Sequence, residues 1–176
     1  MSDAPLKARS FAIIEPTDLD KLAKIALKKL DDAFKRHPEK RLLYETNFLG
    51  ICLCQGAADH FLQLIGSKGI HDFDLWIFFR RNPKAPFYNR KGSTFDFIEP
   101  KFGRSTEPGL RKYKGRKVDV FWRAIPATAI ENGPQAIMKF FANPQTRSAR
   151  ELRDKSAILI WPHPIQTVWR PERSTI

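Results

Sequence analysis

Three aspartates set in otherwise apolar segments are the residues of this chain best suited to chemistry. Asp72 and Asp74 lie at the start of HDFDLWIFF, and Asp119 lies within KVDVFW. Side chains alternate along a strand, so Asp72 and Asp74 share one face with Cα atoms about 6.5–7 Å apart. Two such carboxylates raise each other's pKa and resist burial, whereas a divalent cation such as Mg²⁺ removes their repulsion. The alternative is that both lie in water at the mouth of the strand.

Asp119 is a lone carboxylate inside a second apolar segment, where it needs a cation, a hydrogen-bond donor or a place at the strand edge. If its strand lies beside that of Asp72 and Asp74, the three carboxylates converge. Three carboxylates can hold two metal ions about 3.5–4 Å apart, an arrangement that serves in-line phosphoryl or nucleotidyl transfer. Mg²⁺ is the expected ion, with Mn²⁺ as its substitute.

Gly56 and Ala57 follow an apolar strand and precede a short helical stripe. A turn of this kind exposes backbone N–H groups at a helix N-terminus, where anions bind. A tight turn that holds no ligand is the alternative.

In this order, the motifs resemble the nucleotidyltransferase superfamily with the polymerase-β-like fold, and the chain looks most like small bacterial nucleotidyltransferase-like proteins. The family pattern has a Gly-small turn, then two aspartates around a hydrophobic residue, then a strand with one acidic residue between hydrophobic ones. The matching segments are Gln55-Gly56-Ala57, Asp72-Phe73-Asp74 and Val118-Asp119-Val120. The resemblance covers about residues 48–123.

The resemblance implies that the protein moves a nucleoside monophosphate from an NTP donor to an acceptor hydroxyl. Asp72 and Asp74 would bind the metal and through it the triphosphate. Asp119 would complete the metal site and help to deprotonate the acceptor. Gly56, Ala57 and the neighbouring backbone would hold the β- and γ-phosphates. The acceptor is open: RNA, DNA, protein or a small molecule.

Two positions depart from the family pattern. Ala57 stands where the family often has Ser, and His71 stands where it often has Ser or Thr. The alternative function is therefore a catalytically inactive nucleic-acid-binding or regulatory domain on the same fold. A metal-dependent sugar-nucleotide transferase or a phosphatase is less expected, and the D-x-D-x-T phosphatase motif fails because Trp76 occupies its threonine position.

The positive charge of the chain is concentrated between the two aspartate-bearing segments. The 176 residues carry a formal net charge of +12, and residues 80–123, with 13 basic and four acidic residues, account for +9. We call residues 80–116 the basic insert and expect parts of it to rim the site, where a nucleic-acid acceptor would make backbone contacts. The candidate phosphate contacts are Lys68, Lys91, Lys101, Arg104 and Arg116.

The composition excludes several classes of protein. With 42% hydrophobic residues, 14 Phe and 4 Trp, the chain can build a core and is not predicted to be disordered. It has no run of about 18 apolar residues and no apolar signal segment in residues 1–10. We therefore expect a cytoplasmic protein that does not bind membranes. Cys52 and Cys54 share one strand face and are expected to be buried thiols.

Hydrophobic periodicity predicts one domain over residues 1–176, of the α+β class, with a mixed β-sheet flanked by helices in a nucleotidyltransferase-like fold. An N-terminal helix is expected over 17–37 with Thr17 as its N-cap. A core that carries the motifs follows over 48–123, and residues 124–176 should add helices and a strand. Strands are expected over 48–55, 72–79, 93–98, 117–122 and 157–161, and further helices over 58–65, 133–143 and 148–154.

Overall fold

Six apolar segments form one mixed β-sheet in the computed structural model, which describes residues 9–84 and 92–172. The strand order is β3-β4-β2-β1-β5-β6. Strands β2 and β4 are parallel, and all other neighbouring strands are antiparallel. The strands are β1 (Phe48–Cys54), β2 (Phe73–Arg80), β3 (Ser93–Phe97), β4 (Arg116–Ile125), β5 (Ala157–Trp161) and β6 (Gln166–Trp169).

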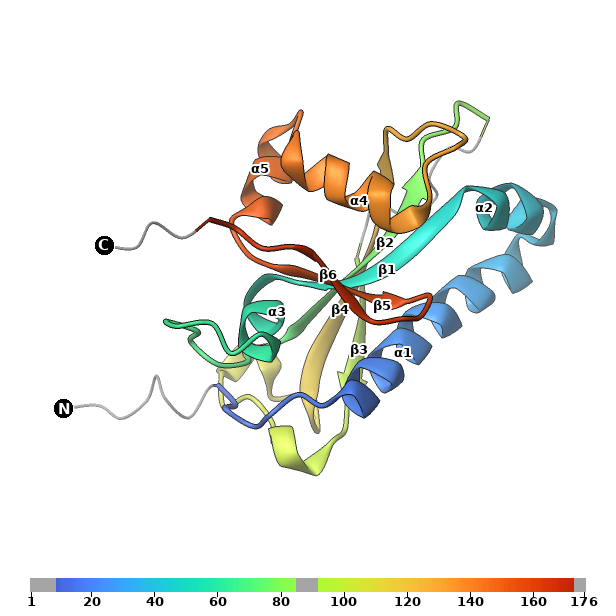
Figure 1. Cartoon of the computed structure of the whole chain (residues 1–176). Coiled ribbons are helices and arrows are strands. Elements are labelled where there is room, and N and C mark those ends of the chain that lie inside the picture. Colours follow the sequence, from blue (N-terminus) through green and yellow to red (C-terminus); the bar gives the residue numbers. More distant parts are fainter. Residues whose placement is uncertain (1–8, 85–91, 173–176) are drawn as a thin grey trace.

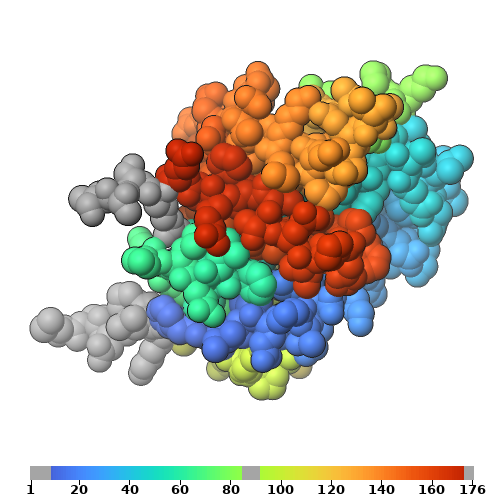
Figure 2. Space-filling model, in the orientation of Figure 1, coloured from blue at the N-terminus to red at the C-terminus, as the bar shows by residue number. Residues whose placement is uncertain are grey.

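Helices cover both faces of this sheet (Figure 1). In the space-filling view, the C-terminal strands lie between α4 and α5 on one side and the N-terminal helix on the other (Figure 2). The helices are α1 (Pro16–Arg36), α2 (Arg41–Asn47), α3 (Gln55–Phe61), α4 (Gly133–Ala142) and α5 (Arg147–Arg153), with 3-10 turns η2 (Pro38–Lys40), η3 (Pro100–Phe102) and η4 (Pro108–Leu110).

The alternation of side chains along β2 divides the core into two clusters. Phe73, Leu75, Ile77 and Phe79 are buried in the cluster that contains the apolar stripe of α1. On the opposite face, Phe78 is buried in the cluster that contains α4. Asp74 and Trp76 follow the same alternation as Phe78, so they lie on the α4 face of the sheet.

The predicted α+β class and the mixed sheet are confirmed, and the strand over 157–161 has the predicted bounds. The predicted N-cap of α1, Thr17, is wrong. The N-cap is Glu15, because the Asp18 carboxylate accepts a hydrogen bond of 2.7 Å from the Glu15 N–H, and Pro16 occupies the first helical position. The buried thiols of Cys52 and Cys54 are confirmed.

The helix predicted over 58–65 is shifted in the structure. It begins at Gln55 and ends at Phe61, and Gln63 takes a left-handed conformation with φ 52° that does not continue a helix. Ile65, which the prediction placed on the apolar stripe, is 97% exposed. Helix α2 and strand β6 were not predicted.

The close approach of Gly115 to strand β3 yields a first test. A Cβ at buried Gly115 would overlap the carbonyl group of Phe97, which is backbone and cannot move aside. Gly115→Ala is therefore expected to lower the free energy of unfolding by about 1–3 kcal/mol. Gly109, with nothing within 4 Å of an added Cβ, is the matched control. Urea denaturation measures both variants, and equal midpoints for Gly115→Ala and Gly109→Ala would contradict the packing argument.

Candidate metal centre

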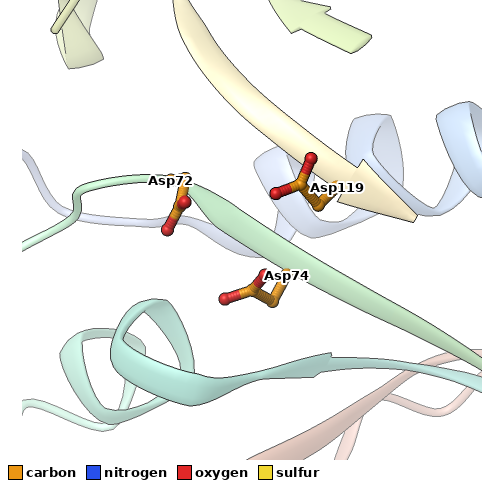
Figure 3. Close-up of side chains that lie close together, drawn as sticks. All are labelled: Asp72, Asp74 and Asp119. Carbon is orange, nitrogen blue, oxygen red and sulfur yellow. The ribbon is translucent and has the colours of Figure 1, made fainter. Parts of the chain in front are cut away.

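The register between β2 and β4 places two aspartates side by side. These parallel strands pair Phe73 with Val118 and Asp74 with Asp119. Asp72 lies immediately before β2 and approaches from the same side (Figure 3). Carboxylate oxygens of Asp72, Asp74 and Asp119 lie within 4.8 Å of one another. The predicted convergence of the three carboxylates is therefore present in the structure.

Among the three aspartates, Asp74 has the least favourable environment for a negative charge. Burial, and then the neighbouring Asp72 and Asp119, raise its pKa to about 7, while Lys117 and His71 act in the opposite direction. Within residues 9–84 and 92–172, the Asp74 carboxylate has no hydrogen bond or ion pair. A cation is the partner that such a group lacks.

Lys117 is a member of the site that the sequence analysis counted only as part of the general charge. Its Nζ lies 2.8 Å from Asp119 Oδ2 and 3.7 Å from Asp72 Oδ2. Burial lowers the pKa of Lys117, but the three carboxylates raise it more, so that it lies above its ordinary value. The signal was available, since residues 117 and 119 are two apart and share one strand face.

Neighbouring polar groups orient the two outer aspartates. The Thr94 hydroxyl on edge strand β3 donates to Asp119 Oδ1 at 3.1 Å. His71 Nδ1 lies 3.3 Å from Asp72 Oδ2, and its Nε2 lies 2.8 Å from Glu107 Oε1. One nitrogen of the His71 ring thus contacts Asp72, while Glu107 holds the other.

The donor set fits a divalent cation. Three carboxylates face one ammonium group, that of Lys117, so the cluster keeps a net negative charge when its carboxyls are ionised. Mg²⁺ and Mn²⁺ both prefer carboxylate oxygens and leave positions for substrate phosphates. Asp72, Asp74 and Asp119 are the residues that would hold the ion.

The predicted turn at Gly56 and Ala57 is the start of α3, where Gln55 adopts a left-handed backbone with φ 64°. The side chain of Ala57 is buried in the core, so only the backbone of this turn is available to a ligand. Lys155 was missed by the sequence analysis, and its Nζ lies 3.9 Å from the position of a Cβ built on Gly56. Only the fold reveals this proximity, because residues 56 and 155 are far apart in the chain.

Two of the predicted phosphate contacts, Lys101 and Arg116, have partners within the protein. Lys101 pairs with Asp18 at 2.6 Å and Glu15 at 2.9 Å, which ties η3 to the start of α1. Arg116 is buried, and its Nε donates to the Phe102 carbonyl at 2.9 Å. Both side chains hold the basic insert in place.

The remaining candidates are exposed or undescribed. Lys68 and Arg104 are exposed, and among the described contacts neither bonds to the three aspartates. Lys91 lies outside the described residues. Phosphate contacts by these residues stay predictions.

Comparison with protein-family models, with curated proteins and with solved structures found no match. Among the described helices, none combines the length and the apolar character needed to cross a bilayer.

The raised pKa of Asp74 predicts how stability depends on pH and metal. The folded protein holds a proton on Asp74 that the unfolded chain releases near pH 4. The contribution of this group to the free energy of unfolding therefore falls as pH rises from about 4 to 7. Asp74→Asn removes this half-buried charge. In EDTA at pH 8 we expect the variant to melt at least about 2 °C above the parent protein, with a smaller difference at pH 5.

Mg²⁺ should reverse this ranking, because it stabilises only the protein that keeps the carboxylate. Differential scanning fluorimetry at pH 8 measures this effect. Increasing Mg²⁺ is expected to raise the melting temperature of the parent protein and not that of Asp74→Asn. Asp32→Asn on α1 is the matched control and should respond to Mg²⁺ like the parent. Equal Mg²⁺ responses of the parent and Asp74→Asn would exclude a metal site at Asp74.

Proposed function

We propose that this protein is a Mg²⁺-dependent nucleotidyltransferase with a nucleotidyltransferase-like fold. The observation that carries the proposal is the convergence of Asp72, Asp74 and Asp119 at two adjacent parallel strands, with Asp74 half-buried and, among the described residues, without a hydrogen bond or ion pair. Further support comes from the order of the motifs along the chain and from the positive charge between them.

In the proposed reaction, Asp72 and Asp74 would hold the metal, and Asp119 would complete the metal site. The acceptor oxygen forms a bond to the α-phosphorus of the NTP, the bond to the β-phosphate breaks, and pyrophosphate leaves. The proton of the acceptor hydroxyl passes to Asp119, which acts as the base. The metal supplies charge neutralisation for the triphosphate, and positioning and electrostatics provide most of the catalysis.

Lys117 is suited to a positioning role in this reaction. Its ammonium group contacts Asp119 and Asp72, and so holds the two outer carboxylates toward each other. Because it lies among three acids, it remains charged at neutral pH.

The proposal is tested by incubating the protein with α-labelled NTPs, Mg²⁺ and separate pools of RNA, DNA, protein and small-molecule acceptors. Label transfer is expected in one pool and should fall by at least about 100-fold in Asp72→Asn/Asp74→Asn, because the metal and its charge neutralisation are lost. Asp32→Asn should keep the parental rate. Metal and NTP binding that the double substitution leaves unchanged would refute the proposal.

A second candidate function, nucleic-acid binding without catalysis, is favoured by one specific observation. Between η3 and β4 the basic insert exposes four cations: Arg104, Arg111, Lys112 and Lys114. Such a group can contact a phosphate backbone without any carboxylate.

This candidate predicts strongly salt-dependent binding of single-stranded RNA. Each phosphate contact contributes about −0.7 to the slope of log K against log salt. Arg111→Gln/Lys112→Gln should therefore make the slope shallower, while Asp72→Asn/Asp74→Asn should leave it unchanged. Fluorescence anisotropy with a labelled oligonucleotide measures both, and an affinity indifferent to salt would exclude this candidate.

A further inference from the structure

A cavity of about 600 Å³ lies where β4 meets the segment that joins α4 to α5. Its walls include the aromatic rings of Trp76 and Phe140, two arginines, Arg81 and Arg123, and the hydroxyl-bearing Thr146 and Ser148. This volume falls in the range of small-molecule sites, which are typically about 300–1,000 Å³.

The lining of the cavity carries positive charge without matching negative charge. Among the described residues that line it, none is acidic. Lys139 also lines the cavity, but its ammonium group pairs with Glu131 at 2.8 Å. Arg81 and Arg123 have no carboxylate partner within residues 9–84 and 92–172. The cavity is therefore suited to an anion.

Arg123 is the most constrained of these cations. Its guanidinium carbon lies 4.7 Å from the ring centroid of Trp76 and 5.5 Å from that of Phe140. One of its N–H groups donates to Ser148 Oγ at 3.1 Å, and burial lowers the pKa of Arg123. A guanidinium group has five N–H donors and matches phosphate oxygens in pairs, so most of its capacity is left for a ligand.

The cavity and the metal centre lie on one face of the sheet. Along β4, residues 119, 121 and 123 share that face, and along β2 residues 74 and 76 share it. Trp76 and Phe121 stack at 4.8 Å between the two sites. By strand geometry, Trp76 lies about 7 Å and Arg123 about 13 Å along the strands from the aspartate pair.

We propose that this cavity binds a nucleoside monophosphate unit, with its phosphate on Arg81 and Arg123 and its base in the apolar part of the cavity, which is lined by Pro126, Phe140 and Ala149. This site lies on the same face of the sheet as Asp74 and Asp119. The assignment of the cavity as a nucleotide-binding site depends only on the cavity itself. Its further assignment as the acceptor site rests on the proposed function. The acceptor class is then a nucleotide and not a protein or an unphosphorylated small molecule.

The test is calorimetric titration in EDTA of the Asp72→Asn/Asp74→Asn protein, which removes the metal centre from the measurement. AMP and UMP are expected to bind, and adenosine and inorganic phosphate are expected to bind at least about tenfold more weakly, because each lacks one half of the recognised group. Adenosine binding as tightly as AMP, or inorganic phosphate binding as tightly as AMP, would overturn the assignment.

Variants locate the binding to the cavity. Arg81→Met changes an exposed residue, so it should fold normally and weaken AMP binding about tenfold. Arg150→Met, on the exposed surface of α5 outside the cavity, is the matched control and should bind AMP like its parent. Equal AMP affinity in the Arg81→Met and Arg150→Met proteins would refute the placement.

The two proposals can fail separately. AMP binding in the double aspartate variant, together with absent NTP transfer by the parent, would retain the nucleotide site and reject the transferase. If transfer occurs, Arg81→Met should raise the KM for a nucleotide acceptor about tenfold and leave the dissociation constant of the NTP unchanged. An unchanged acceptor KM would reject the cavity as the acceptor site.

Discussion

The in-register pairing of β2 with β4 is the constraint on which the rest of the site depends. It places the carboxylates of Asp74 and Asp119 next to each other on a half-buried sheet surface. Like charges opposite each other destabilise a pair of strands. Lys117, Thr94 and His71 partly offset this repulsion at Asp119 and Asp72, but none of them bonds to Asp74. The remaining repulsion at Asp74 is therefore one that a bound cation would relieve.

The positive charge of the basic insert is divided between structure and surface. Lys101 and Arg116 are engaged by α1 and by the backbone of the insert, so they keep the segment between β2 and β4 in place. The exposed cations of the same segment remain available to an anionic partner. A net charge that looked like one feature in the sequence thus serves two purposes, and only the contacts of each side chain separate them.

Local patterns predicted the elements better than their arrangement. Apolar runs located five strands, and the aspartate spacing located the candidate site, because both depend on neighbours in the chain. The adjacency of residues 74 and 119, the ion pairs of Lys117 and the approach of Lys155 to Gly56 depend on long-range packing. The spacing of residues in the chain does not encode such contacts. Helix α2 and strand β6 are short and border proline-containing segments, so their periodic signal is weak.

The parallel pairing of β2 and β4 also bears on how the chain folds. Parallel neighbours cannot be joined by a tight hairpin, so the whole segment between them must return across the sheet before Asp119 reaches Asp74. Closing such a loop costs chain entropy that local contacts do not repay. A divalent ion held by Asp72, Asp74 and Asp119 would join the two ends of this loop, and so act as a non-covalent cross-link between β2 and β4.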